Sequence, residues 1–236
     1  MPEPAADIEI ETDERVFLAG KTDSGKTYLA QRLLRPIQRL VVLDPKASPS
    51  IDQWRLAPWD RESQRLLRNG QPVRTRVKLP AADTLESFWD DVLFECWNAG
   101  NVVVYVDEVY LLKPEGGAYP RYLSRLFTTG RERGIGAWAS AQRPTWIPLV
   151  LISESEHVFV FRLNLEDDRI AMGKNKHPEL AQEIPHSDAH GFRYYNERQD
   201  RPIYFPEYDE DGPGGGLGDL GDLVSEESEL EEIDER

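Results

Sequence analysis

A glycine-rich octapeptide near the start of the chain has the residue types needed to bind nucleotide phosphates. Residues 20–27 read Gly-Lys-Thr-Asp-Ser-Gly-Lys-Thr and match the pattern G-x-x-x-x-G-K-[ST] at every fixed position. In such a loop successive backbone N–H groups surround the phosphates, and the positive end of the following helix faces them. The second lysine reaches the β- and γ-phosphates, and the following threonine binds Mg²⁺. The sequence therefore predicts a site for ATP and Mg²⁺ made of Gly20, Lys21, Thr22, Asp23, Ser24, Gly25, Lys26 and Thr27, with Thr27 on the metal.

Two adjacent acids end the most strand-like segment of the chain. Residues 101–106 read Asn-Val-Val-Val-Tyr-Val and are followed by Asp107 and Glu108. This is the Walker-B arrangement, in which Asp107 holds Mg²⁺ through water and Glu108 polarises the water that attacks the phosphate. An acid at a strand end is weak evidence alone, but it gains specificity when it follows a phosphate loop at the distance typical of one domain. Kinases and simple GTPases usually lack the glutamate here, so the pair favours a hydrolase over a phosphotransferase.

A third polar cluster surrounds the predicted strand of residues 136–142. Gln142 ends this strand, and a polar side chain there can contact the γ-phosphate and respond to its loss. Arg131 and Arg133 lie in the short loop before the strand, where one of them could reach the nucleotide of a neighbouring subunit. The alternative for either arginine is a solvated basic turn. Arg143 is a further candidate, although its place before Pro144 indicates a fixed structural contact.

Short apolar strands alternate with helices along the chain, which is typical of a mostly parallel sheet covered on both faces. Residues 192–195 and 202–205 are expected to pair as a terminal hairpin. The predicted class is therefore α/β. The expected strands are residues 15–19, 39–44, 73–79, 101–107, 136–142 and 157–163, and the expected helices are residues 25–35, 61–69, 83–99, 119–130 and 166–173.

The formal net charge of −15 is distributed unevenly along the 236 residues. Residues 1–14 hold six acids and no Lys or Arg, and residues 206–236 hold thirteen acids and one Arg. The remaining 27 basic and 24 acidic residues leave residues 15–205 with a net charge of +3. Acid-rich ends with few aromatic residues are usually solvated. We therefore expect an acidic N-terminal segment (1–14), a P-loop ATPase domain (15–205) and a glycine-rich, flexible acidic tail (206–236).

Several other kinds of site and location are disfavoured by the sequence. The single Cys96 excludes an internal disulfide and a cysteine-based zinc site, and it reads as a small buried hydrophobe. The four histidines, His157, His177, His186 and His190, show no metal-ligand spacing. The acidic start lacks the features of a signal peptide, and the apolar runs are far below the roughly 20 residues of a membrane span. We expect a soluble cytoplasmic protein without a membrane partner.

Four motifs in order resemble those of the FtsK–HerA superfamily of P-loop ATPases. They are the loop of residues 20–27, Asp44-Pro45-Lys46, Asp107-Glu108, and the run from Arg133 to Pro144 that contains Gln142-Arg143-Pro144. Residues 155–163 also resemble the last core strand of that family, so the similarity covers roughly residues 15–170. The family consists of ring-shaped, ATP-driven DNA translocases. The resemblance implies a RecA-like ASCE sheet, a homo-oligomeric ring of five or six subunits with shared active sites, and double-stranded DNA in the central channel.

The branch of the family is inferred from features that the chain lacks. From the sequence given, we expect no transmembrane segments, no N-terminal barrel before the phosphate loop and no C-terminal nuclease domain. The chain therefore looks most like the genome-packaging ATPase of a small phage or an internal-membrane virus, which would act in the host cytoplasm and dock transiently at the portal vertex of a prohead. Two alternatives stay open: a cellular or plasmid DNA translocase of the same superfamily, and an ATP-gated phage assembly or adaptor protein that does not move DNA.

Overall fold

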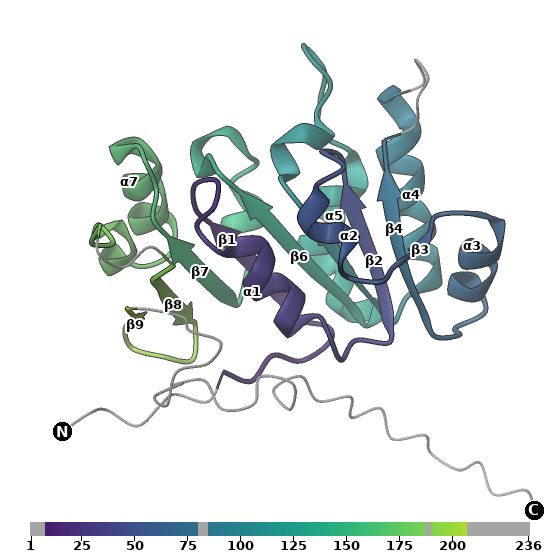
Figure 1. Ribbon diagram of the computed structural model, residues 1–236, viewed down its shortest axis with the longest axis horizontal. Coiled ribbons are helices and arrows are strands. Elements are labelled where there is room, and N and C mark those ends of the chain that lie inside the picture. Colours follow the sequence, from purple (N-terminus) through teal and green to yellow (C-terminus); the bar gives the residue numbers. More distant parts are fainter. Residues whose placement is uncertain (1–7, 80–84, 187–189, 207–236) are drawn as a thin grey trace, which may run out of the picture.

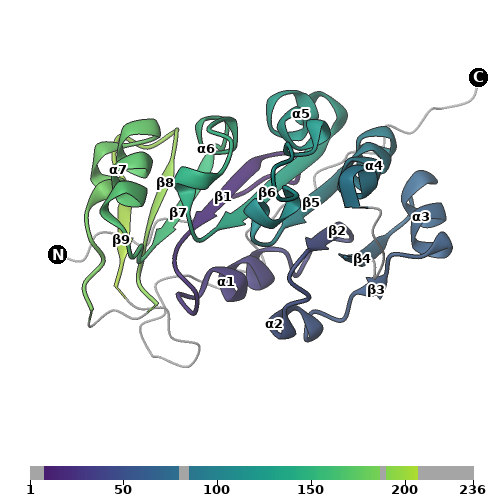
Figure 2. The same cartoon turned by 90° about the horizontal axis from the view of Figure 1, so that it is seen from above.

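The computed structural model of the protein describes residues 8–79, 85–186 and 190–206, which build one nine-stranded sheet with helices on both faces (Figures 1 and 2). The strand order is β3-β4-β2-β5-β6-β1-β7-β8-β9. The strands are β1 (Arg15–Ala19), β2 (Arg39–Asp44), β3 (Ala57–Pro58), β4 (Val73–Lys78), β5 (Val102–Val106), β6 (Ile135–Ala141), β7 (His157–Phe161), β8 (Phe192–Asn196) and β9 (Ile203–Phe205).

Every strand pair from β3 across to β7 is parallel, and only β7–β8 and β8–β9 are antiparallel. The central strands are buried along their whole length, as expected of a parallel sheet covered on both sides. The predicted α/β class, with a mostly parallel sheet and a C-terminal hairpin, is confirmed.

Helices cover the two faces of the sheet unequally. They are α1 (Lys26–Leu33), α2 (Pro49–Asp52), α3 (Arg61–Arg68), α4 (Leu85–Ala99), α5 (Arg121–Thr129), α6 (Val150–Ser153) and α7 (Glu166–Asn175). Helices α1 and α2 pack on one face, and the other five contribute to the core on the opposite face (Figure 2). Strand β5 serves both cores, since Val104 faces one and Tyr105 the other. Cys96 lies buried in the α4 core, and burial raises its thiol pKa to about 12.

Short elements that the sequence does not predict complete the chain. They are α2, β3, α6 and four 3₁₀ turns: η1 (Val109–Leu112), η2 (Gly130–Arg133), η3 (Pro144–Trp146) and η4 (Pro178–Ala181). Each spans four residues or fewer, too short for hydrophobic periodicity to reveal. All the long predicted strands and helices are present, with ends shifted by a few residues.

The described part of the acidic N-terminal segment, residues 8–14, differs from the solvated chain that its composition predicts. Ile8 and Ile10 are each 1% exposed and belong to the core beneath α1. The segment also crosses β6 closely, because a Cβ on Gly136 would lie 2.2 Å from the carbonyl oxygen of Thr12. Burial of the two isoleucines outweighs the solvation of the acids in this segment, so residues 8–14 are part of the packed domain.

Two further expectations concern the ends of the chain and the membrane. Most of the predicted acidic tail, residues 207–236, lies outside the described residues, as do residues 1–7. Within the described residues, none of the helices has both the length and the apolar character that a membrane crossing requires.

Candidate nucleotide-binding site

The phosphate loop is anchored to the ends of the strands on either side of β1. The backbone N–H of Gly20 donates to the carbonyl of Ala141 at the end of β6 (3.1 Å), and that of Lys21 donates to Arg162, just after β7 (2.8 Å). A Cβ at position 20 would lie 2.6 Å from the Cβ of Phe161, so only glycine fits there. Gly25, just before α1, has φ = +99°, a left-handed value that favours glycine. The loop is thereby fixed at the start of α1, whose first N–H groups have no partners within the helix.

Lys26 lies inside the curve of this loop. Its Nζ donates to the carbonyls of Gly20 (2.6 Å) and Lys21 (3.0 Å) and lies 3.8 Å from Oε1 of Glu108. The side chain is 4% exposed, and burial lowers its pKa, an effect that the nearby Glu108 and Asp107 carboxylates oppose. A cation held in this way is already directed at the position where an anion enclosed by the loop would lie.

Three hydroxyl groups converge on one oxygen of Asp107. Oδ1 accepts from Tyr105 (2.8 Å), Ser140 (3.1 Å) and Thr27 (3.4 Å). Carboxylate and hydroxyl oxygens are ligands that Mg²⁺ accepts, and in such sites the ion usually keeps several waters and substrate phosphate oxygens. The described residues contain no group of three or more His, Cys, Asp or Glu side chains placed to hold a metal. Thr27 and Asp107 therefore fit an Mg²⁺ that arrives with the nucleotide.

Glu108 is held in a strained backbone conformation with one oxygen free. Its φ of +55° is unusual for a residue with a side chain, and such strain often marks functional positions. Its Oε1 accepts from Nε2 of Gln142 (2.6 Å), and the Oε1 of Gln142 accepts from the Thr22 hydroxyl (3.0 Å). Its Oε2 is buried and has no hydrogen-bond partner among the described residues. This oxygen is suited to accept a hydrogen bond from a water molecule.

These groups line a common cavity of about 330 Å³ at the carboxyl ends of the parallel strands. The predicted residues in its lining are Thr22, Asp23, Ser24, Gly25, Lys26, Thr27, Asp107, Glu108 and Gln142. The hydroxyl of Ser24 is buried there without a hydrogen-bond partner in the described part of the chain, as a phosphate ligand would need. Both the polarity and the unpartnered groups of the cavity fit the triphosphate of ATP.

Five further residues line the cavity without having been predicted as site residues: Tyr28, Lys46, Ser48, Ser50 and His190. Lys46 carried a usable signal, because Asp44-Pro45-Lys46 follows a strand, and parallel strands end at the same edge of a sheet. The other four belong to no motif.

Arg131 and Arg133 do not reach this cavity. They belong to η2, before β6, and so lie at the edge where the parallel strands begin, opposite the phosphate loop. Arg131 is 3.4 to 3.7 Å from Glu11, Asp13 and Glu156, and Arg133 donates to the carbonyl of Trp97 (2.7 Å). Arg143 pairs with the buried Asp168 (2.7 Å), the structural contact predicted for it. Any contact of Arg131 or Arg133 with a nucleotide would have to be made to another subunit.

The chain is similar to known viral packaging proteins in both sequence and structure. It is 28% identical over 163 residues to the DNA packaging ATPase P9 of Enterobacteria phage PRD1, an alignment that covers 66% of this chain and 67% of that protein. The resemblance to packaging ATPases is confirmed. The genome packaging NTPase B204 of Sulfolobus turreted icosahedral virus 2, solved in complex with AMP, has a TM-score of 0.67 at 16% identity and covers 83% of this chain and 98% of B204.

A cellular ATPase has the same fold at lower similarity. ATPases 2 and 3 of EssC from Geobacillus thermodenitrificans give a TM-score of 0.52 at 15% identity, over 89% of this chain and 42% of that one. No protein-family model matches the chain. The structural likenesses establish the fold alone, and the relative found by sequence is named as a DNA packaging ATPase.

Proposed function

We propose that this protein is a genome-packaging ATPase that hydrolyses ATP at the cavity enclosed by the phosphate loop. The observation that carries the proposal is that Lys26, Thr27, Asp107, Glu108 and Gln142, drawn from three separate parts of the sequence, line one cavity. The packaging ATPase of phage PRD1, which is similar in sequence over two thirds of its length, supports the assignment to packaging.

Each of these side chains has a distinct part in hydrolysis. The loop N–H groups and Lys26 bind the β- and γ-phosphates and stabilise the charge that develops on the transferred phosphoryl group. Thr27 and Asp107 would hold Mg²⁺, which would supply positive charge to the phosphates. Glu108 orients the attacking water through its free oxygen, and Gln142 fixes the other oxygen of that carboxylate. When the phosphate leaves, Gln142 and Thr22 are the groups positioned to respond.

We further propose that hydrolysis drives translocation of double-stranded DNA by a homo-oligomeric ring, docked on a prohead portal. The near-neutral body of residues 15–205 supports this, since the excess acidity lies outside it. A cellular or plasmid DNA translocase of the same superfamily is the second candidate.

One assay tests the main proposal and its rival together. The rate of phosphate release from ATP is measured alone, with long double-stranded DNA, and with DNA plus proheads. A packaging ATPase is stimulated most by DNA and proheads together, whereas a cellular translocase responds to DNA only. Lys26→Ala serves as the inactive control, and circular dichroism verifies that this variant is folded. Wild-type turnover in that variant would show that the cavity is not the ATP site. If DNA does not change the rate of the wild-type protein, the chain would instead be an ATP-gated assembly protein.

A further inference from the structure

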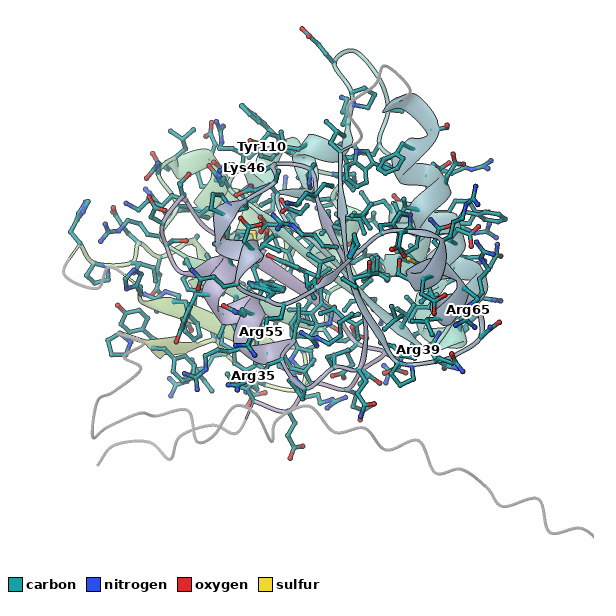
Figure 3. All side chains as sticks on the ribbon, turned by 45° about the vertical axis from the view of Figure 1, so that its right-hand side comes forward. Arg35, Arg39, Lys46, Arg55, Arg65 and Tyr110 are labelled. Carbon is teal, nitrogen blue, oxygen red and sulfur yellow. The ribbon has the colours of Figure 1, made fainter. Side chains whose placement is uncertain are left out.

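We propose that Lys46 is a second phosphate-binding cation, which contacts the γ-phosphate and so distinguishes ATP from ADP. This inference rests on the proposed ATPase function and adds a residue to its site. Lys46 comes from the turn after β2 and lines the same cavity as the phosphate loop, Glu108 and Gln142. It follows the carboxyl end of β2 and lies in the upper part of the view in Figure 3.

The turn that carries Lys46 is held in place by hydrogen bonds to Asp44. The carboxylate of Asp44 is fully buried and accepts hydrogen bonds from the backbone N–H of Ser48 (3.0 Å) and from Nε of Arg76 (2.8 Å). The backbone N–H of Ala47 donates to the carbonyl of Asp44 (3.3 Å), and Ala47 has φ = +53°. Asp44 is therefore a structural anchor, and the functional end of the Asp-Pro-Lys motif is its lysine.

Lys46 is exposed and has no acidic partner in the described part of the chain, whereas Lys26 and Arg76 each have one. Lys26 is within 3.8 Å of Glu108, and Arg76 is occupied by Asp44 and Asp52. Lys46 is also close enough to Lys26 for their mutual repulsion to contribute, after burial, to the lowered pKa of Lys26. A bound polyphosphate would relieve this repulsion by accepting hydrogen bonds from both ammonium groups.

The strand order indicates which phosphate Lys46 contacts. Strand β2 lies beside β5, which carries Asp107 and Glu108, and is three positions from β1 in the sheet. At about 4.8 Å per strand, the end of β2 is roughly 14 Å from the start of the phosphate loop. A lysine side chain spans less than half of that distance, so Lys46 approaches from the side of Glu108. The phosphate on that side is the one that water attacks.

The test compares nucleotide affinities of Lys46→Ala, Lys46→Arg and the wild type, by calorimetry with Mg²⁺ and either ATPγS or ADP. Because a charge-assisted hydrogen bond is lost, Lys46→Ala should weaken ATPγS binding by roughly tenfold to a hundredfold, and ADP binding by less than about twofold. Lys46→Arg should recover part of the loss. Lys174→Ala, an exposed lysine at the end of α7 that does not line the cavity, is the matched control.

Several results would overturn the proposal. These are unchanged affinity for both nucleotides, equal weakening of both, and loss of DNA affinity with normal nucleotide binding, which would make Lys46 a DNA contact. Lys26→Ala is measured beside them to separate the two hypotheses. If Lys26→Ala weakens binding and Lys46→Ala does not, only the role of Lys46 fails. If Lys26→Ala binds ATPγS normally, the proposed ATP site itself fails.

Discussion

The adjacent residues Asp107 and Glu108 have different surroundings, and this difference predicts different losses on substitution. Asp107 accepts hydrogen bonds from three hydroxyl groups, one of which belongs to Thr27. Glu108 instead has one buried oxygen with no hydrogen-bond partner in the described residues. Glu108→Gln should still bind ATP but hydrolyse it about 10²- to 10⁴-fold more slowly, since water activation is lost. Asp107→Asn should weaken Mg²⁺-dependent binding instead. Nucleotide affinity and phosphate release are measured on both variants, and more than a tenth of normal turnover in Glu108→Gln would argue against its role.

The Tyr105 hydroxyl makes a testable contribution to the metal site. It donates to Oδ1 of Asp107 (2.8 Å) from a fully buried ring, and that ring stacks on Trp54. Tyr105→Phe keeps this packing and removes one of the groups that orient the carboxylate. Because outer-shell partners of a metal ligand typically contribute about 10- to 100-fold to metal affinity, we expect the Mg²⁺ concentration for half-maximal turnover to rise by about tenfold.

Tyr194→Phe is the matched control for this experiment. Tyr194 is also buried, and its hydroxyl lies 2.9 Å from Nδ1 of His157, far from the cavity at the other edge of the sheet. This variant should lose some thermal stability and keep the wild-type Mg²⁺ requirement. Equal Mg²⁺ curves for all three proteins would show that Tyr105 does not position Asp107.

Residue types and spacing were sufficient to predict most of the residues that line the cavity, but not the groups that hold them in place. Residues 20–27, Asp107, Glu108 and Gln142 each lie in a recognisable local pattern. Ser140 bridges Oδ1 of Asp107 and the backbone N–H of Glu108 only because β5 and β6 pair in register, with Val106 opposite Ala139. Such a contact joins residues 33 positions apart and has no local signal in the sequence.

At the scale of elements, the long buried strands were predictable and the short segments around them were not. The run of β-branched residues in β5 indicates a strand wherever it occurs. By contrast, the average charge of residues 8–14 hides the alternation that buries Ile8 and Ile10 and leaves Glu9 exposed. Whether an acidic segment is solvated thus depends on a few apolar positions and on the surface available to them.

Glu14 is the polar anchor of that segment. Its fully buried carboxylate accepts from Arg198 (2.7 Å) and lies 2.7 Å from Nε2 of His157. Burial alone would raise its pKa, but the hydrogen bonds from His157 and the backbone of Glu11 and the charge of Arg198 lower the pKa below its ordinary value. A lowered pKa stabilises the fold above the unfolded-state pKa of 4.5, and this contribution is lost as the pH falls through the folded-state value.

Glu14→Gln should therefore destabilise the protein at neutral pH by about 3–5 kcal/mol, the usual cost of removing one partner of a buried ion pair. The difference from the wild type should shrink as the pH falls below 4.5. Urea unfolding at several pH values measures this, with Glu9→Gln in the same segment as the exposed control. A difference that stays constant across the pH range would mean that the Glu14 charge contributes nothing.

At the scale of the whole molecule, the distribution of charge predicts an effect of the C-terminal acids on DNA binding. Residues 209–236 carry twelve acids and one arginine, while residues 15–205 have a net charge of +3. Deletion of residues 209–236 should strengthen non-specific binding of double-stranded DNA, most visibly at low salt, because repulsion between like charges is removed. Titration of fluorescent DNA at two salt concentrations checks this. Unchanged or weaker binding would indicate that these acids instead contact a basic partner such as a portal.

In a ring, Arg131 at one edge of the sheet would act on the nucleotide bound at the opposite edge of a neighbouring subunit. Arg131 lies at the edge opposite its own phosphate loop, and its contacts with Asp13, Glu156 and Glu11 are 3.4 to 3.7 Å long with 43% of the side chain exposed. Ion pairs this exposed contribute little, so Arg131 is available to a neighbouring subunit. If it acts there, subunits must pack head to tail, with the strand-start edge of one near the nucleotide of the next.

An arginine supplied across an interface raises turnover by about 10³- to 10⁵-fold in related phosphoryl transfers. Arg131→Ala and Lys26→Ala should each be inactive alone. Mixed, they should regain part of the activity, because some interfaces then pair an intact phosphate loop with an intact Arg131. Arg133→Ala is the comparison: since Arg133 is held by the carbonyl of Trp97 and stacks on that ring, its loss should lower stability. Normal turnover of Arg131→Ala alone would exclude Arg131 as the arginine that acts across the interface. Inactivity without rescue, where mixed rings form, would argue against a role of Arg131 across the interface.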